Sequence, residues 1–295
     1  MKRIWCRIFG GVLVSIAVFL ISCGGMKAAY NKDAAIPVLQ KDVLAKLTGR
    51  VEISQSLIIL ERSTPENREA SRTYLVEVFN KMGLEGRRHT YRENGENVYC
   101  LLSATEPSNE YIILGAHFDS VRDCPGANDN ATGVAVVLGA AQTLKQLPKR
   151  SKNIYFVLFD EEERGMQGSR SFAQKMVDDK INVVSVHTID QMGWDNDGDR
   201  AIELEVPYEE AFKLYTKAVQ NAGFSITIHQ TRETGSDHSS FRRLNFKAVG
   251  LTEEYRNGDT TPYIHKNTDG YDTVNFEYML MATKIVIEAM KLLIQ

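Results

Sequence analysis

Several histidine and carboxylate side chains lie directly after apolar stretches or in turn-rich segments of the chain, in positions where they could bind divalent metal ions. These residues are His117, Asp119, Asp129, Asp160, Glu161, Glu162, Glu163, Asp190 and His265. Gathering so many acidic groups in one place is unfavourable unless cations neutralise them. Histidine and carboxylate ligands without cysteine suit Zn²⁺ or a similar divalent ion. The residue types therefore indicate a metal-binding site.

Each of these pieces also has an ordinary structural interpretation. The acidic run 160–163 alone would be a solvated turn, and His117 alone would be a loop histidine as often as a ligand. Asp129 followed by Asn130 is by itself typical of a turn or of a helix N-cap. The succession of the pieces in one chain argues against a chance arrangement.

Strands that alternate with helices would position these residues. We expect strands at 98–102, 111–115, 153–159, 183–189, 201–206, 225–229 and 248–251, and helices at 38–47, 66–82, 132–147, 168–177, 209–222 and 275–294. The continuous apolar run 153–159 is typical of a strand covered on both faces. We therefore predict a single α/β domain with a mixed, mostly parallel β-sheet and helices on both faces. Sites in such sheets gather at the carboxyl ends of the strands, where the polar residues stand.

The N-terminus has the features of an export signal. Lys2 and Arg3 precede an uncharged apolar run at 8–21. This run has the length of a signal-peptide core and is short for a membrane-spanning helix. It ends in Leu-Ile-Ser-Cys, which resembles the lipobox of bacterial lipoproteins, in which the cysteine, here Cys23, is acylated. An uncleaved anchor with an incidental cysteine is the alternative.

We therefore expect a signal peptide at 1–22, a tether at 23–33 and a folded domain at 34–295. Acyl chains on Cys23 would hold the protein on a membrane. The residue after the cysteine is Gly24 and not Asp, which is compatible with the outer membrane of the cell envelope. The sequence thus indicates an exported bacterial lipoprotein, on either the periplasmic or the surface face.

The composition excludes several classes of protein. Of the 295 residues, 43% are hydrophobic, which is the share found in a folded globular protein. The 35 basic and 38 acidic residues give a net charge of −3, so no basic surface favours nucleic acid. Four cysteines are too few for a disulfide scaffold. Cys100 and Cys124 could pair in an oxidising compartment, but buried free thiols are the commoner outcome and we predict no bond.

The order of these segments resembles the M28 family of zinc exopeptidases, of the aminopeptidase Y type. The resemblance extends from about residue 60 to residue 290. It depends on the segments 115–120 (GAHFDS), 125–133 (PGANDNATG), 162–169 (EERGMQGS), 189–193 (IDQMG) and 236–238 (SDH), and on His265. The first three segments are long and specific.

The resemblance implies a site for two Zn²⁺ ions or other divalent metals. Asp129 would bridge the two ions, and the peptide bond after it would be cis. His117 and Asp190 would complete one site, and Glu163 and His265 the other. Each ion would then have three protein ligands and an open position, as a catalytic zinc requires.

The resemblance also implies two catalytic roles. Glu162 would be the general base that takes a proton from a metal-activated water, while Glu163 is held by metal. Asp119 would hydrogen-bond the nitrogen of His117 that faces away from the metal. Because three glutamates stand in a row at 161–163, their roles are assigned by counting back from Gly165.

The implied function is a metal-dependent aminopeptidase that hydrolyses the N-terminal peptide bond of peptide substrates. A glutaminyl-peptide cyclase with a single zinc is the alternative. The absence of a long insertion after Glu163, and Ile264 rather than Trp before His265, favour the peptidase. A binding module that has lost activity is a third reading, which the complete ligand set disfavours. Residues 254–256 could line the substrate pocket, whereas Asp237 and His238 are expected to be structural.

Overall fold

The computed structural model describes residues 32–295. The expected signal peptide at 1–22, the expected acylated Cys23 and the tether as far as residue 31 lie outside the described residues. No helix of the described part is both long enough and apolar enough to cross a membrane.

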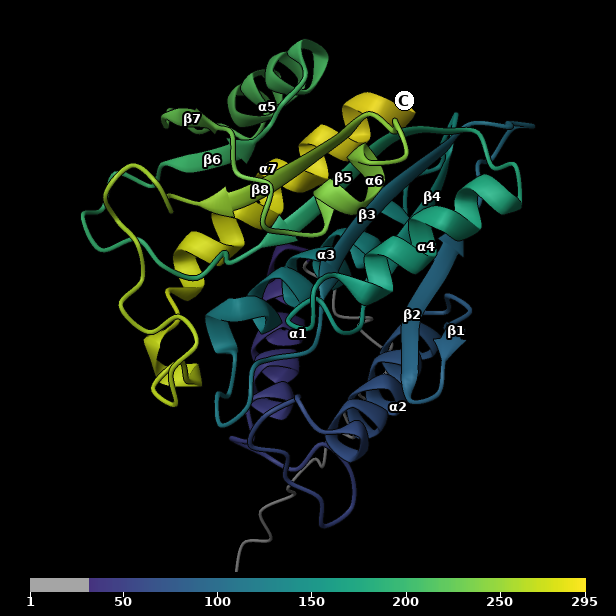
Figure 1. Ribbon diagram of the computed structural model, residues 1–295. Coiled ribbons are helices and arrows are strands. Elements are labelled where there is room, and N and C mark those ends of the chain that lie inside the picture. The colour runs from purple at the N-terminus through teal and green to yellow at the C-terminus, as the bar shows by residue number, and fades with distance from the viewer. Residues whose placement is uncertain (1–31) are drawn as a thin grey trace, which may run out of the picture. The chain divides into compact units, whose positions relative to one another are not determined.

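Eight strands of residues 32–295 form one mixed sheet (Figure 1). They are β1 (Arg87–Arg92), β2 (Gly95–Leu102), β3 (Tyr111–His117), β4 (Asn153–Phe159), β5 (Val183–Asp190), β6 (Ile202–Glu205), β7 (Ile228–Thr231) and β8 (Ala248–Glu253). Their order across the sheet is β1-β2-β4-β3-β5-β8-β6-β7. The central strands β4, β3, β5 and β8 are parallel, and β2 and β6 flank them in the antiparallel direction. The α/β fold with a mixed sheet, predicted from the sequence, is confirmed.

The parallel register aligns the carboxyl ends of the central strands. His117, the last residue of β3, pairs with Phe159, the last residue of β4. Asp190, the last residue of β5, pairs with Thr252 of β8. Because helices cover both faces of these strands, charged side chains are costly within them and are more easily accommodated where a strand leaves the core. The polar residues therefore gather at one edge of the sheet.

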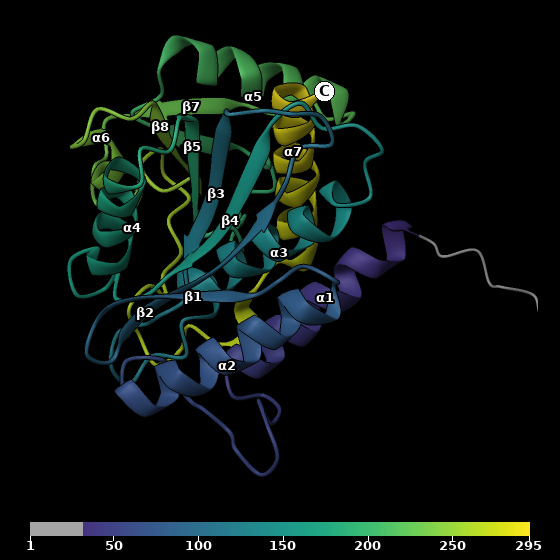
Figure 2. The same ribbon diagram turned by 90° about the vertical axis from the view of Figure 1, so that its right-hand side faces the viewer.

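Helices cover both faces of the sheet (Figures 1 and 2). One face carries α1 (Lys32–Leu47), α2 (Pro65–Lys81), α3 (Thr132–Leu144), α5 (Glu209–Asn221) and α7 (Phe276–Ile294), and the other carries α4 (Gln167–Asp178) and α6 (His238–Arg242). Buried apolar residues form one core on each face of the sheet. Alternate residues of β3 belong to different cores, because successive side chains of a strand point to opposite faces. Ile112 and Leu114 belong to the larger core, and Ile113 to the smaller one.

The structure differs from the expected elements in several places, among them β7, which begins at Ile228 rather than at residue 225, and α3, which ends at Leu144 rather than at residue 147. Helix α1 begins at Lys32 and contains Pro37, whereas we expected a start at residue 38 and a tether as far as residue 33. Strand β1 has a polar sequence with exposed side chains, so no apolar pattern revealed it. Helix α6 has five residues, too few to show a helical period. Cys100 and Cys124 are buried and unpaired, as expected.

Candidate metal centre and active site

The five side chains expected to bind metal meet at the carboxyl edge of the sheet. His117 ends β3, Asp190 ends β5, Asp129 lies in the helical turn η1 (Ala127–Ala131), and Glu163 and His265 come from loops. Ligand atoms of His117, Asp129 and Asp190 lie within 4.8 Å of one another. The same holds for Asp129, Glu163 and His265. Asp129 is common to both groups.

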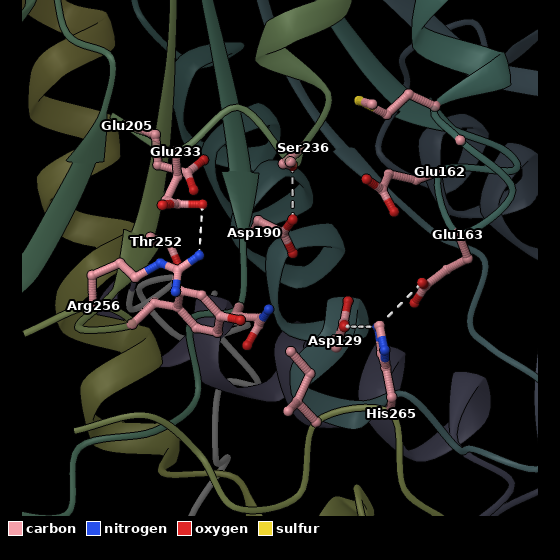
Figure 3. A pocket seen from close by; sticks show the side chains of 16 residues that line it. Asp129, Glu162, Glu163, Asp190, Glu205, Glu233, Ser236, Thr252, Arg256 and His265 are labelled. Atoms are coloured by element: carbon pink, nitrogen blue, oxygen red, sulfur yellow. Dashed lines mark hydrogen bonds and ion pairs between the residues drawn. The ribbon is translucent and has the colours of Figure 1, made fainter. Parts of the chain in front are cut away.

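The Asp129 carboxylate lies between two imidazole rings, one of which is drawn in Figure 3. Its Oδ1 is 3.2 Å from His117 Nε2, and its Oδ2 is 3.1 Å from His265 Nε2. Asp190 Oδ1 lies 3.4 Å from His117 Nε2, and Glu163 Oε2 lies 3.2 Å from His265 Nε2. Each oxygen of Asp129 thus belongs to a different group of donors, as in a carboxylate that bridges two ions.

The main chain around Asp129 is held from two sides. The Asp269 carboxylate accepts the backbone N–H groups of Asn128 at 2.9 Å and of Asp129 at 3.1 Å. The Asn130 side chain donates to the carbonyl of Ile189 at 2.8 Å, and so connects η1 to the end of β5. The peptide bond between Asp129 and Asn130 is cis, as the resemblance implied.

The loop between His117 and Asp129 is fixed by a buried arginine. Arg62 is fully buried, and its guanidinium donates to the carbonyls of Phe118 at 2.5 Å and Gly126 at 2.8 Å. A third donation, of 2.7 Å, reaches the carbonyl of Leu47 at the end of α1. A planar guanidinium with five N–H groups can hold several carbonyls in one geometry. Arg62 therefore joins α1 to the loop that carries the site.

Asp119 holds the segment that carries the two glutamates. Its Oδ1 accepts the backbone N–H of Glu162 at 3.0 Å, and its Oδ2 accepts that of Glu163 at 3.2 Å. The contact between Asp119 Oδ1 and His117 Nδ1 measures 3.4 Å, which is long for a hydrogen bond. The structure thus places Asp119 beside His117, as expected, but its stronger contacts are to the main chain of residues 162–163.

The three consecutive glutamates have different surroundings. Glu161 accepts hydrogen bonds from Arg68 at 2.9 Å and Arg92 at 2.8 Å. Glu162 and Glu163 line the cavity described below. Glu163 faces His265, whereas the carboxylate of Glu162 has no hydrogen-bond or ion-pair partner among residues 32–295. Ligand atoms of Glu162, Glu163 and His117 also lie within 4.8 Å of one another. The assignment of Glu162 as base and Glu163 as ligand stays a prediction.

The electrostatics of the group fit bound cations. Burial raises the pKa of Glu163 to about 7. Hydrogen bonds to Asp129 and Glu163 raise the pKa of His265 to about 10. The buried atoms Glu163 Oε1 and Asp190 Oδ1 have no hydrogen-bond partner among the described residues. Without metal the group thus retains protons and spare oxygen ligands where a divalent ion would fit, and its imidazole and carboxylate donors suit zinc.

These side chains line one side of a cavity of about 370 Å³. Ser236 donates its hydroxyl to Asp190 Oδ2 at 2.7 Å and so orients that carboxylate. The other side of the cavity is formed by Glu205, Glu233 and Arg256, which Figure 3 shows opposite the metal-binding group. Charged side chains therefore lie on both sides of the cavity.

Other residues singled out from the sequence have mixed positions. Tyr255 and Arg256 line the cavity, as expected, whereas Glu254 does not belong to its lining. Asp237 is buried near Glu162. Burial raises the pKa of Glu162, and the negative charges of Asp237 and of other nearby carboxylates raise it further. His238 lies beneath the cavity wall, 3.3 Å from Glu205.

Sequence reasoning did not find four residues that support the site: Arg62, Glu205, Ser236 as an Asp190 partner, and Asp269. A signal existed only for Ser236, which precedes the Asp-His pair of a recognised segment. Arg62 and Asp269 act on the main chain of distant residues. Such contacts have no spacing that a sequence could reveal.

The family is decided by a match over most of the domain. Residues 97–290 match the model of peptidase family M28. The chain belongs to this family. The match covers every metal-binding candidate and the strands that carry them.

Two relatives with curated names are aminopeptidases. The chain is 27% identical over 290 residues to a probable leucine aminopeptidase of Arthroderma otae, covering 88% of this chain and 76% of the relative. It is 33% identical over 166 residues to the probable lipoprotein aminopeptidase LpqL of Mycobacterium tuberculosis, covering 50% of this chain and 32% of LpqL. The chain thus spans about a third of the length of that relative.

Solved structures share the fold. LapA of Legionella pneumophila superposes with a TM-score of 0.75 at 20% identity, covering 91% of this chain and 77% of LapA. BSAP, a zinc aminopeptidase from Bacillus subtilis, gives a TM-score of 0.63 at 22% identity, covering 68% of this chain and 50% of BSAP. A glutaminyl cyclase of Bacteroides thetaiotaomicron gives a TM-score of 0.69 at 18% identity, covering 88% of this chain and 97% of the cyclase. At these identities the similarity establishes the fold alone.

Proposed function

We propose that this M28 member is a dinuclear zinc aminopeptidase that removes the N-terminal residue of peptides. The observation that carries the proposal is the position of Asp129, whose two oxygens face two separate groups of histidine and carboxylate donors. The names of the aminopeptidases among its relatives, and of the zinc enzyme among its structural neighbours, support the same activity.

Two divalent ions held by His117, Asp129, Asp190, Glu163 and His265 would polarise the peptide carbonyl and lower the pKa of a water molecule. The protein supplies the orientation of these ligands. Asp269, through the main chain, and Ser236, through a direct hydrogen bond, hold Asp129 and Asp190 in place.

Glu162 would be the proton carrier of the reaction. Its carboxylate lines the cavity without a hydrogen-bond or ion-pair partner among the described residues, so it is available to a water molecule. It would take a proton as the water attacks the carbonyl carbon, and give this proton to the amine when the peptide bond breaks. Asp119 accepts the main-chain N–H groups of Glu162 and Glu163, and so fixes the segment that carries both side chains.

Cyclisation of N-terminal glutamine with one zinc is a second candidate function. The fold likeness to a glutaminyl cyclase, which is covered over 97% of its length, favours it. The two functions differ in metal count and product. Close to one zinc per chain, together with cyclisation of Gln peptides, would replace the aminopeptidase proposal.

We also propose that the protein is an exported lipoprotein held on the membrane through Cys23, with the outer membrane as its place. The lipobox-like Leu-Ile-Ser-Cys sequence and the name of the lipoprotein relative support this. A Cys23→Ala variant should move the protein from the membrane fraction to the soluble fraction. Retention of that variant on the membrane would contradict acylation at this residue.

The activity is tested with aminoacyl-arylamides that have either a free or an acetylated α-amino group. The purified protein should release the arylamine only from the free-amine substrates, and a chelator should abolish the release until Zn²⁺ is restored. Equal cleavage of the acetylated substrates, or turnover that resists the chelator, would contradict a metal-dependent aminopeptidase.

A further inference from the structure

The cavity wall opposite the metal-binding group contains a buried carboxylate, that of Glu205. This residue ends β6, and its side chain is 10% exposed. The Oε2 atom is buried and has no hydrogen-bond partner among the described residues. A Cβ at Gly250, the β8 residue paired with Glu205, would overlap this oxygen, so the glycine leaves room for the carboxylate.

The histidine next to Glu205 does not balance its charge. His238 Nδ1 lies 3.3 Å from Glu205 Oε2, while His238 Nε2 lies 3.1 Å from the carbonyl oxygen of Glu233. A carbonyl can only accept, so Nε2 carries the hydrogen. Burial lowers the pKa of His238 to about 4, which leaves the ring neutral at physiological pH.

The arginine in the same wall is already engaged. Arg256 Nη2 lies 2.8 Å from Glu233 Oε2, and its guanidinium lies 5.0 Å from the ring centre of Tyr255. No lysine or arginine of residues 32–295 lies within ion-pair distance of Glu205. Glu205 therefore has no cationic partner within the described protein. Burial raises its pKa to about 8, so a cation bound beside it would stabilise the charged form of the carboxyl group.

Glu205 is placed to meet the side chain of a substrate. It lines the same cavity as Glu162 and Asp190, and in Figure 3 Asp190 lies between Glu205 and the pair formed by Asp129 and His265. A peptide whose terminal carbonyl lies at the metal-binding group could extend its first side chain toward β6. Met166 and Ile264 also line the cavity and offer apolar surface for the methylene groups of such a side chain.

We propose that Glu205 binds a cationic side chain, so that the protein prefers peptides that begin with lysine or arginine. This inference rests on the proposed aminopeptidase function. A charge-assisted hydrogen bond from an ammonium or guanidinium group would supply the partner that the protein itself lacks. The alternatives are an acidic side chain bound by Arg256 and the uncharged amide of glutamine, and both are outcomes of the test.

The kinetic test compares arylamides of Lys, Arg, Leu, Gln and Glu. For the natural protein, kcat/KM for Lys and Arg should exceed that for Leu by at least about tenfold, the ratio for about 1.4 kcal/mol. Glu205→Gln should remove this preference by lowering kcat/KM for Lys and Arg at least about tenfold relative to kcat/KM for Leu. Glu254→Gln is the matched control, since Glu254 is also a buried glutamate of the sheet edge but lies outside the cavity lining, and it should keep the preference.

A binding test separates this inference from the proposed function. L-lysinamide and L-norleucinamide differ only in the terminal ammonium group, so calorimetry with the zinc-loaded protein measures the contribution of that group. Lysinamide should bind at least about tenfold more tightly, and Glu205→Gln should equalise the two. Equal or absent binding of both, or a kinetic preference for Leu, Gln or Glu, would overturn the role of Glu205. Lack of turnover with a retained lysinamide preference would overturn the aminopeptidase function alone.

Discussion

Asp119→Asn tests how the main chain positions the two glutamates. Asp119 is 2% exposed, and each of its oxygens accepts one backbone N–H, from Glu162 at 3.0 Å and from Glu163 at 3.2 Å. Asparagine has nearly the same shape but only one oxygen. Its amide group would point N–H bonds at the second backbone N–H, so one of the two buried donors would lose its acceptor.

The magnitude follows from these two hydrogen bonds. Hydrogen bonds to a charged group contribute about 1.5–3 kcal/mol each, and a buried donor without a partner costs about 1–3 kcal/mol. Asp119→Asn should therefore lower the free energy of unfolding by about 2–4 kcal/mol. Because Glu163 and His117 both lie against Asp119, zinc affinity should fall by about 10–100-fold, the range for outer partners of metal ligands.

Two measurements check this prediction. Urea unfolding of the metal-free protein gives the stability difference, and competition with a fluorescent chelator gives the zinc affinity. Asp123→Asn is the matched control, because Asp123 is exposed in the same loop and its φ of 60° is one that asparagine readily adopts. Stability and zinc affinity of Asp119→Asn equal to those of the control would refute the positioning role.

Three further predictions follow from the same geometry. Glu162→Gln should retain its metal and fold but lose about 10²–10⁴ in kcat, and near-normal turnover would remove Glu162 as the base. His265→Ala should lose one of two zinc ions per chain by elemental analysis, and an unchanged zinc content would exclude His265 as a ligand. Burial raises the pKa of Glu205 to about 8 and that of Asp237 to about 7. A carboxyl group whose pKa is higher in the folded than in the unfolded protein contributes stability that is fully present below about pH 4 and is lost as the pH rises through the folded-state pKa. The Tm of the chelator-treated protein should therefore be lower at pH 9 than at pH 5.

The elements that carry the site could be predicted because their sequence patterns are strong. Strand β4 occupies residues 153–159 as expected, since a continuous apolar run of this length has few alternatives in a sheet covered on both faces. Helix α2 starts after Thr64, whose hydroxyl accepts the N–H of Asn67 at 3.2 Å. Thr as the cap and Pro65 as the first residue are common at helix starts, and the helix begins one residue before the expected position. Local chemistry determines these boundaries.

The remaining features depend on contacts between distant segments. Strand β1 forms by pairing with β2, although its own residues are polar. Glu205 ends a strand that runs antiparallel to β8, so the rule that sites collect at the carboxyl ends of parallel strands did not indicate it. Arg62 stabilises a loop through carbonyl groups, which every sequence has. No spacing of residue types could reveal these contacts.

The most direct measurement of the central claim is anomalous diffraction at the zinc edge from crystals of the zinc-loaded protein. Our account predicts two peaks about 3.5–4 Å apart, one beside His117 and Asp190 and one beside Glu163 and His265, with Asp129 between them. A single peak, or peaks away from Asp129, would contradict the two-ion site at the edge of the sheet.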